Sequence, residues 1–137
     1  MKVRILHRLV QEIPADKWPL QLALEKKSDE VESKHGHPTP RRYRAMYGKE
    51  NANIRVHQRE YESFADYAKR FEEFGDNIEL QAMEVERRNY FTWEREELYI
   101  VDDPNEPIMP WLKMISLDPN STERNLVVNP DWEDLGL

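Results

Sequence analysis

Charged and titratable side chains recur at every second position in the segment 54–61. Arg55, His57 and Arg59 alternate there with other residues, and alternate residues of a β-strand lie on the same face. Guanidinium groups bind carboxylate, phosphate or enolate oxygens, and a histidine can transfer a proton near neutral pH. The spacing therefore predicts an anion-binding face on which His57 moves the proton.

Three residues from neighbouring strands complete the predicted site. Arg44 adds a further guanidinium, and Trp93 and Tyr99 supply aromatic surface. The ligand-binding residues expected from the sequence are Arg44, Arg55, Arg59, Trp93 and Tyr99, with His57 as the catalytic residue. Because aromatic residues are enriched in interface cores, Trp93 and Tyr99 are also candidates for a seam between two subunits.

A structural role for the arginines is the main alternative. Opposite charges on neighbouring strands commonly pair, and the chain has a formal net charge of −7. In that interpretation the arginines form ion pairs across strands or across a dimer, with Glu60, Glu94, Glu96 or Glu97. His7 lies at the same alternate positions as the apolar residues of the first strand, which favours a hydrogen-bonded core histidine.

No metal or cofactor is expected. The chain has no cysteine and only four glycines, so it lacks thiolate ligands and a glycine-rich phosphate loop. His35 and His37 form a His-x-His pair in a proline-rich loop, but metal sites normally need three or four ligands. We expect both histidines to be solvated.

Length and composition indicate one globular domain with an appended segment. The chain has 137 residues, of which 39% are hydrophobic and 34% are charged, and a chain of this size can bury a core. The negative net charge argues against nucleic-acid binding. No apolar run reaches the ~18 residues that span a bilayer, so we expect no membrane partner and a cytoplasmic location.

The periodicity predicts four strands and the helices between them. We expect strands over residues 3–13, 42–47, 54–61 and 92–101, the middle two forming a hairpin around Gly48. The first helix follows Asp16, ends near Gly36 and exposes Glu25, Lys26, Lys27, Asp29, Glu30 and Lys34. The second begins at Ser63 with a capping box and ends at Gly75, and a third begins at Asp76. The second has its core stripe at Phe64, Tyr67, Ala68, Phe71 and Phe74.

This order is β-α-β-β-α-β, the ferredoxin-like signature of an α+β fold with a four-stranded antiparallel sheet. We expect the domain to span residues 1–102. Residues 103–137 form a proline-rich C-terminal extension, with a candidate short strand over residues 111–117, that packs on the domain or on a partner subunit.

In such a fold the helices cover one face of the sheet. The residues expected beneath the helices are Ile5, Tyr43, Ala45, Ile54, Val56, Leu98 and Ile100. Those expected on the open face are Arg4, Leu6, Arg8, Val10, Arg44, Met46, Arg55, His57, Arg59, Tyr61, Trp93, Arg95, Glu97 and Tyr99. That face mixes apolar and charged groups, which predicts a homodimer with a polar cavity between the two sheets.

The order of elements, the segment NIRVHQREYESFADYAKRFEEF and the Gly48 hairpin resemble the dimeric α/β-barrel superfamily. Within it, REYES followed by FADYAKRF is similar to small NIPSNAP-like proteins. The resemblance covers residues 2–102 and implies a homodimer. The superfamily includes cofactor-independent monooxygenases, isomerases, haem degraders and proteins of unknown activity. The Asn, Trp and His arrangement of the haem degraders does not map onto this chain.

Two main classes of function follow from the sequence, with haem binding as a third hypothesis that a Soret band on adding haemin would reveal. The first is a homodimer that binds a small aromatic or amphipathic anion between its sheets, with or without activity as a cofactor-independent monooxygenase or isomerase. The second is a non-enzymatic interaction module, in which the charged face joins two subunits. Whether the inward arginines are paired discriminates between them.

Overall fold

A computed structural model describes residues 4–49, 51–102, 105, 115–117 and 126–128. Most of the expected C-terminal extension therefore lies outside the described residues. The strands are β1 (Ile5–Glu12), β2 (Arg41–Arg44), β3 (Ile54–Tyr61), β4 (Trp93–Ile100), β5 (Ile115–Leu117) and β6 (Leu126–Val128). The helices are a 3-10 turn (Ala15–Lys17), α1 (Trp18–Lys34), α2 (Phe64–Asp76) and α3 (Ile78–Arg87).

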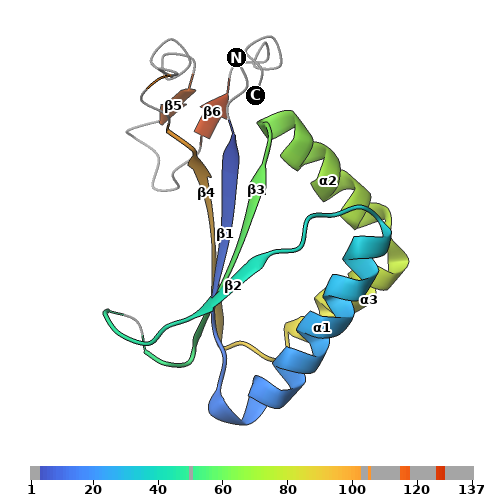
Figure 1. Ribbon diagram of the computed structural model, residues 1–137, viewed down its shortest axis with the longest axis vertical. Coiled ribbons are helices and arrows are strands. Elements are labelled where there is room, and N and C mark those ends of the chain that lie inside the picture. Colours follow the sequence, from blue (N-terminus) through green and yellow to red (C-terminus); the bar gives the residue numbers. More distant parts are fainter. Residues whose placement is uncertain (1–3, 50, 103–104, 106–114, 118–125, 129–137) are drawn as a thin grey trace.

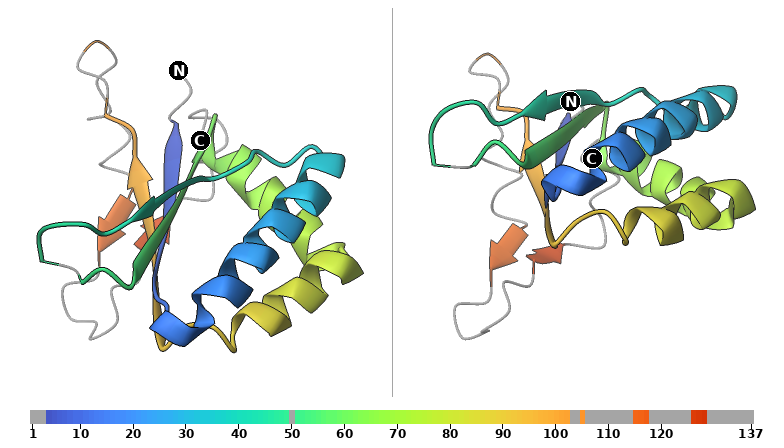
Figure 2. Two further views of the ribbon diagram at one scale, coloured as in Figure 1. Left: turned by 60° about the horizontal axis from the view of Figure 1, so that its bottom comes forward. Right: turned by 90° about the horizontal axis from the view of Figure 1, so that it is seen from below.

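The main sheet has four antiparallel strands in the order β2-β3-β1-β4. All three α-helices lie on one side of it, as Figure 1 and Figure 2 show. The predicted ferredoxin-like α+β fold is confirmed. β5 and β6 form a separate antiparallel pair, and β5 begins four residues after the start expected for a strand in that segment.

Local signals in the sequence set the helix boundaries. The Ser63 hydroxyl accepts a hydrogen bond from the backbone N–H of Asp66 at 3.0 Å, as expected for a helix N-cap. Gly36 follows α1 with a φ of 73°, a conformation that favours glycine. The third helix is capped by Asn77, not by Asp76, because its side chain accepts from the N–H of Leu80 at 3.0 Å.

The sequence predicted which side chains lie on the helix-covered face of the sheet. This prediction is correct for β1 and β4 and wrong for β2 and β3. In the register, Val56 lies opposite Val10, and His57 lies opposite Leu9 and Arg42. Directly opposed residues of antiparallel strands share a face, so Ile54, Val56 and Tyr43 lie away from the helices. The arginines and His57 of β3 lie beneath them.

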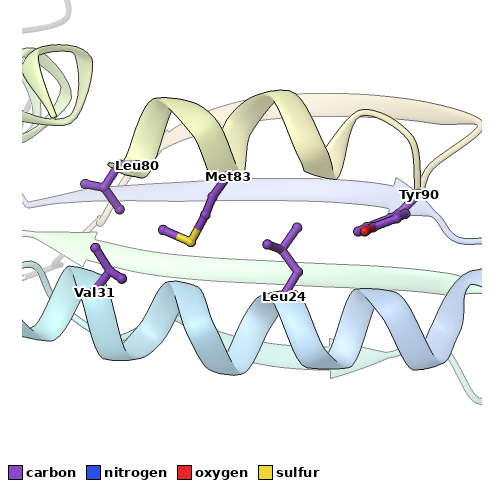
Figure 3. Close-up of a cluster of buried hydrophobic side chains, with 5 residues drawn as sticks. All are labelled: Leu24, Val31, Leu80, Met83 and Tyr90. Carbon is purple, nitrogen blue, oxygen red and sulfur yellow. The ribbon is translucent and has the colours of Figure 1, made fainter. Parts of the chain in front are cut away.

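Within the described part of the chain, apolar clusters form both between the helices and on the far face of the sheet. Leu24 and Val31 of α1 pack against Leu80 and Met83 of α3, with Tyr90 at the end of the seam (Figure 3). A second cluster lies on the opposite face of the sheet and comprises Val10, Ile54, Val56, Ala45 and Trp93. The space between α1 and the sheet is left to polar side chains.

The predicted core stripe of α2 forms a helix face but is not buried. No residue of α2 is buried, and Phe71 is 65% exposed. Tyr67 lies at the centre of an aromatic cluster, with ring centroids 5.3 Å from Tyr61 and 6.2 Å from Phe71. Phe74 packs against the cluster between α1 and α3, and the stripe is otherwise only partly covered.

Candidate functional site

The arginines of β3 and its neighbour β2 are paired with carboxylates of α1. Arg42 donates to both oxygens of Asp29, at 2.7 and 2.8 Å. The Nε of Arg55 donates to Glu25 at 2.8 Å. These pairs join the sheet to the helix through long side chains, where a ferredoxin-like fold would ordinarily place aliphatic residues.

A third pair joins Arg59 to Glu32, with Nη2 donating to Oε2 at 2.5 Å. Glu25 and Glu32 are both buried, and Asp29 is half-buried. The expectation that Glu25 and Asp29 lie on the exposed side of α1 is therefore wrong. Residues 25, 29 and 32 are separated by four and three positions, the spacing of one helix face, and that spacing is the signal that sequence reasoning missed.

His57 belongs to a chain of hydrogen bonds that crosses all four strands. Nδ1 of His57 accepts from Nε of Arg42 at 3.0 Å, so Nε2 carries the proton and donates to Oε1 of Gln11 at 2.8 Å. Gln11 in turn donates to Glu94 of β4 at 2.9 Å. Every donor in this cross-sheet network points from β2 toward β4, an arrangement in which successive bonds polarise one another.

The helices anchor both ends of the network. Arg42 is held by Asp29 of α1, and Glu94 accepts from Arg87 of α3. Burial lowers the pKa of His57 to about 3, and the charges of Arg42, Arg55 and Arg59 act in the same direction. His57 is therefore a neutral, fully bonded imidazole at physiological pH.

A cavity of about 510 Å³ lies between the sheet and the helices and is here called the interlayer cavity. Five carboxylate and five guanidinium residues line it in balance: Glu25, Glu32, Glu84, Glu94 and Glu96, and Arg42, Arg59, Arg70, Arg87 and Arg88. Its apolar lining includes Tyr67, Phe71, Phe74, Leu80 and Met83. The cavity is thus amphipathic, with charged groups from the sheet and from all three α-helices and aromatic groups from α2.

Two buried polar atoms on the cavity lining have no hydrogen-bond partner within the described part of the chain. They are the Oε1 of Gln21 and the Nε of Arg59. Buried polar atoms in folded proteins are nearly always satisfied. The unsatisfied acceptor comes from α1 and the unsatisfied donor from β3, and each indicates a position that a bound molecule can complete.

His7 also lines the cavity, beside the aromatic cluster of α2. Its Nε2 lies 2.7 Å from Oε1 of Glu96, and its ring centroid lies 5.8 Å from that of Tyr67. The hydrogen bond from His7 lowers the pKa of Glu96, and burial raises the pKa of Tyr67 to about 12. The expected hydrogen bond of His7 is confirmed, and its partner is a carboxylate on β4.

The predicted site residues fall into separate groups. His57 and Arg59 line the interlayer cavity, and Arg55 lies on the same face, bonded to Glu25. Arg44 lies on that face at the start of α1, where its guanidinium stacks 4.0 Å from the centre of the Trp18 ring. The structure does not bring Trp93 and Tyr99 to these residues, because both lie on the opposite face.

The described residues include no group of three His, Cys, Asp or Glu side chains that could hold a metal ion. Among these residues, no helix is long and apolar enough to cross a bilayer. His35 contacts the side-chain amide of Asn77 at 2.9 Å.

Comparison with known proteins finds similarity in structure. No family model and no curated protein matches the sequence. A NIPSNAP family protein from Agrobacterium tumefaciens has a TM-score of 0.64 at 14% identity, covering 76% of this chain and 90% of that one. A NIPSNAP-like domain protein from Burkholderia xenovorans has a TM-score of 0.52 at 12% identity, covering 93% and 97%.

A candidate antibiotic biosynthesis monooxygenase from Nitrosomonas europaea has a TM-score of 0.53 at 10% identity, covering 76% of this chain and 95% of that one. At these identities the likeness concerns the fold alone. It confirms the resemblance that the order of elements predicted. The chain has the ferredoxin-like α+β fold that these NIPSNAP family proteins also have.

Proposed function

We propose that this protein binds a small amphipathic molecule in the interlayer cavity. The observation that carries the proposal is the pair of unsatisfied buried atoms, Gln21 Oε1 and Arg59 Nε, on the lining of a cavity of about 510 Å³. Ligand sites in proteins typically have volumes of about 300–1,000 Å³ and combine apolar walls with a few polar groups. The cavity has both properties.

The chemistry of the lining indicates the class of ligand. Arg59 Nε–H offers a donor to a carbonyl or carboxylate oxygen, and Phe71 and Phe74 offer contact to an aromatic or aliphatic body. Because the charged residues of the lining balance, a neutral or singly anionic molecule fits better than a polyanion. This proposal places the ligand inside one chain, whereas the sequence suggested a cavity between two sheets.

The alternative is that the charged layer serves only to hold the helices on the sheet. The pairing of Arg42, Arg55 and Arg59 with α1 favours this role for most of their donor groups. It leaves the unsatisfied atoms without explanation. Enzymatic activity as a cofactor-independent monooxygenase or isomerase remains a proposal, supported by the shared fold of the candidate monooxygenase.

A thermal-shift screen of small aromatic acids and aromatic ketones tests the proposal. Arg59→Lys retains a cation for Glu32 and removes Nε–H, so hits should bind this variant about tenfold more weakly, the loss expected for one hydrogen bond. Arg41→Lys, an exposed position on β2, is the matched control and should bind like wild type. The proposal fails if no compound stabilises the wild type, or if every hit stabilises Arg59→Lys equally.

We also propose that two copies associate through the face of the sheet opposite the helices. On that face Tyr43 is 47% exposed and Tyr99 is 44% exposed, beside the apolar cluster around Val10. Aromatic residues at the edge of an apolar patch are typical of interface cores. The shared fold with dimeric α/β-barrel proteins supports the same surface.

A further inference from the structure

We infer that His7 and Glu96 form a proton-transfer pair that enolises a carbonyl compound bound in the interlayer cavity. The inference rests on the proposed ligand binding and adds to it a reaction and a substrate class. It replaces the prediction of His57 as proton-transfer residue with a different histidine of the same cavity.

The hydrogen bond between the two side chains fixes the state of the imidazole. A glutamate carboxylate is ordinarily ionised at neutral pH, and an ionised carboxylate only accepts hydrogen bonds. Nε2 of His7 therefore donates to Oε1 of Glu96 across 2.7 Å. In the neutral ring the lone pair is on Nδ1, which accepts no hydrogen bond from the described residues.

A donor for the developing oxyanion lies next to this base. His7 and Arg59 are directly opposite each other in the β1–β3 register, which places their Cβ atoms about 4.5–5.5 Å apart. The Nε of Arg59 is buried without an acceptor, while its Nη2 is fixed by Glu32 at 2.5 Å. A fixed and unsatisfied donor of this kind can stabilise negative charge on a substrate oxygen.

Tyr67 supplies a second donor on the α2 side of the cavity. Its ring centroid lies 5.8 Å from that of His7, and Tyr67 lines the same cavity. Burial raises its pKa to about 12, so the hydroxyl keeps its proton at neutral pH. A base and two oxyanion donors thus come from β1, β3 and α2.

The step needs no co-reactant. Nδ1 of His7 takes a proton from the carbon next to the substrate carbonyl, and the C–H electron pair becomes the C=C bond of an enolate. The carbonyl oxygen takes the negative charge and accepts hydrogen bonds from Arg59 and Tyr67. The imidazolium, stabilised by Glu96, then returns its proton to that oxygen, which completes a tautomerisation to the enol, or to the same carbon, which regenerates the carbonyl compound.

His57 is less suited to this step. Its Nδ1 already accepts from Arg42 at 3.0 Å, so taking a substrate proton would require that bond to break. The two histidines line the same cavity, which makes a direct comparison of their variants informative.

Solvent deuterium incorporation into three enolisable probes tests the inference: 2-tetralone, phenylacetone and phenylpyruvate. Proton NMR in D2O measures exchange at the carbon next to the carbonyl, and saturation-transfer NMR measures binding separately. His7→Gln should bind the probes like wild type and lose at least about 100-fold in exchange rate, the lower end of what general base catalysis contributes. His35→Gln, outside the cavity lining, should exchange at the wild-type rate.

Glu96 acts as a positioning residue, and its test needs a different readout. Long-range 1H–15N NMR of the His7 ring should show the proton on Nε2 in the wild type and mixed tautomers in Glu96→Gln, together with slower exchange. If His7→Gln does not fold, the Glu96→Gln variant provides the test of the inference.

The possible failures are distinguishable. Binding without catalysed exchange in the wild type, or exchange that persists in His7→Gln and is lost in His57→Gln, would overturn the inference while leaving the proposed ligand binding intact. Failure of all three probes to bind the wild type while other compounds of the thermal-shift screen bind would overturn the inference alone, and failure of every compound to bind would overturn both.

Discussion

Glu25 concentrates more of the interlayer contacts than any other side chain of α1 described above. It accepts hydrogen bonds from Gln21 at 3.0 Å and from Arg55 at 2.8 Å. Its carboxylate also lies 3.7 Å from Nε of Arg42 and 3.9 Å from Nε2 of His57. One acidic residue thus compensates several buried cationic or polar groups.

Glu25→Gln should accordingly lower the free energy of unfolding substantially. Removing one partner of a buried ion pair leaves an uncompensated charge, and the loss in free energy of unfolding is typically about 3–5 kcal/mol. Urea unfolding measures it. Glu30→Gln, an exposed change on the same helix, should cost less than about 0.5 kcal/mol. Equal effects of the two changes would show that the charged layer contributes little to stability.

His57 should make the protein less stable in mild acid. Its pKa is lowered from 6.5 to about 3 in the folded chain, so below pH 6.5 the unfolded chain binds a proton that the folded chain does not. Stability therefore falls as pH falls, by about 2 kcal/mol between pH 7.5 and 5. In His57→Gln this part of the pH dependence should be absent, as urea unfolding at each pH would measure. Parallel curves for wild type and variant would contradict the assignment.

The placement of single side chains was the least predictable part of the site from sequence. The alternation of Arg55, His57 and Arg59 correctly predicted that they share a face. The face of the sheet that they occupy depends on the side chains that the covering helix presents to the sheet. Apolar residues usually point toward covering helices, but α1 presents Glu25, Asp29 and Glu32, which match the arginines and turn Ile54 and Val56 outward.

At the scale of elements, α3 contributes more to the core than α2. Leu80 of α3 is 0% exposed in the seam with α1, whereas Phe71 of α2 is 65% exposed. The sequence suggested the reverse, because the aromatic stripe of α2 is the more regular. Regular spacing establishes which residues share a helix face, but burial depends on whether another element covers that face.

Leu80→Ala should therefore cost about 2–5 kcal/mol of unfolding free energy, as expected for a fully buried leucine. Phe71→Ala should cost less than about 1 kcal/mol, because the side chain loses little burial. Guanidinium unfolding of both variants provides the comparison. A larger loss for Phe71→Ala than for Leu80→Ala would mean that α2 is covered by parts of the chain or of a partner outside the described residues.

Element boundaries followed the local signals closely. The strand predicted over residues 54–61 has those bounds, and the helix predicted after Ser63 begins at Phe64. β2 is shorter than expected and ends at Arg44, although the N–H of Ala45 still donates to the carbonyl oxygen of Ile54 at 3.1 Å. Strand alternation and capping residues are local properties, which is why they could be recognised without knowledge of the tertiary contacts.

At the scale of the whole molecule, the proposed dimer depends on β4. Tyr99→Asp or Trp93→Asp would place a charge in the apolar patch and should raise the dimer dissociation constant at least about tenfold, a modest hot-spot effect. Sedimentation velocity checks this, with Lys26→Asp on the exposed side of α1 as control. Tyr61→Asp would not test this surface, because Tyr61, which the sequence predicted on the open face, is buried beneath the helices.

The dimer proposal has its own contradicting results. A wild-type chain that sediments as a monomer at micromolar concentration would exclude it. Unchanged association of both β4 variants would exclude this face of the sheet as the contact surface.

The ionic layer between α1 and the sheet has a calorimetric consequence. Exposing apolar surface raises the heat capacity on unfolding and exposing polar surface lowers it, for an average of about 12–15 cal/mol/K per residue. Arg42, Arg55 and Arg59 with their carboxylates occupy space that aliphatic groups fill in other sheets, so the value per residue should fall below this range in differential scanning calorimetry. The stability curve of this protein would then be unusually flat, with a free energy of unfolding that changes little between cold and warm conditions.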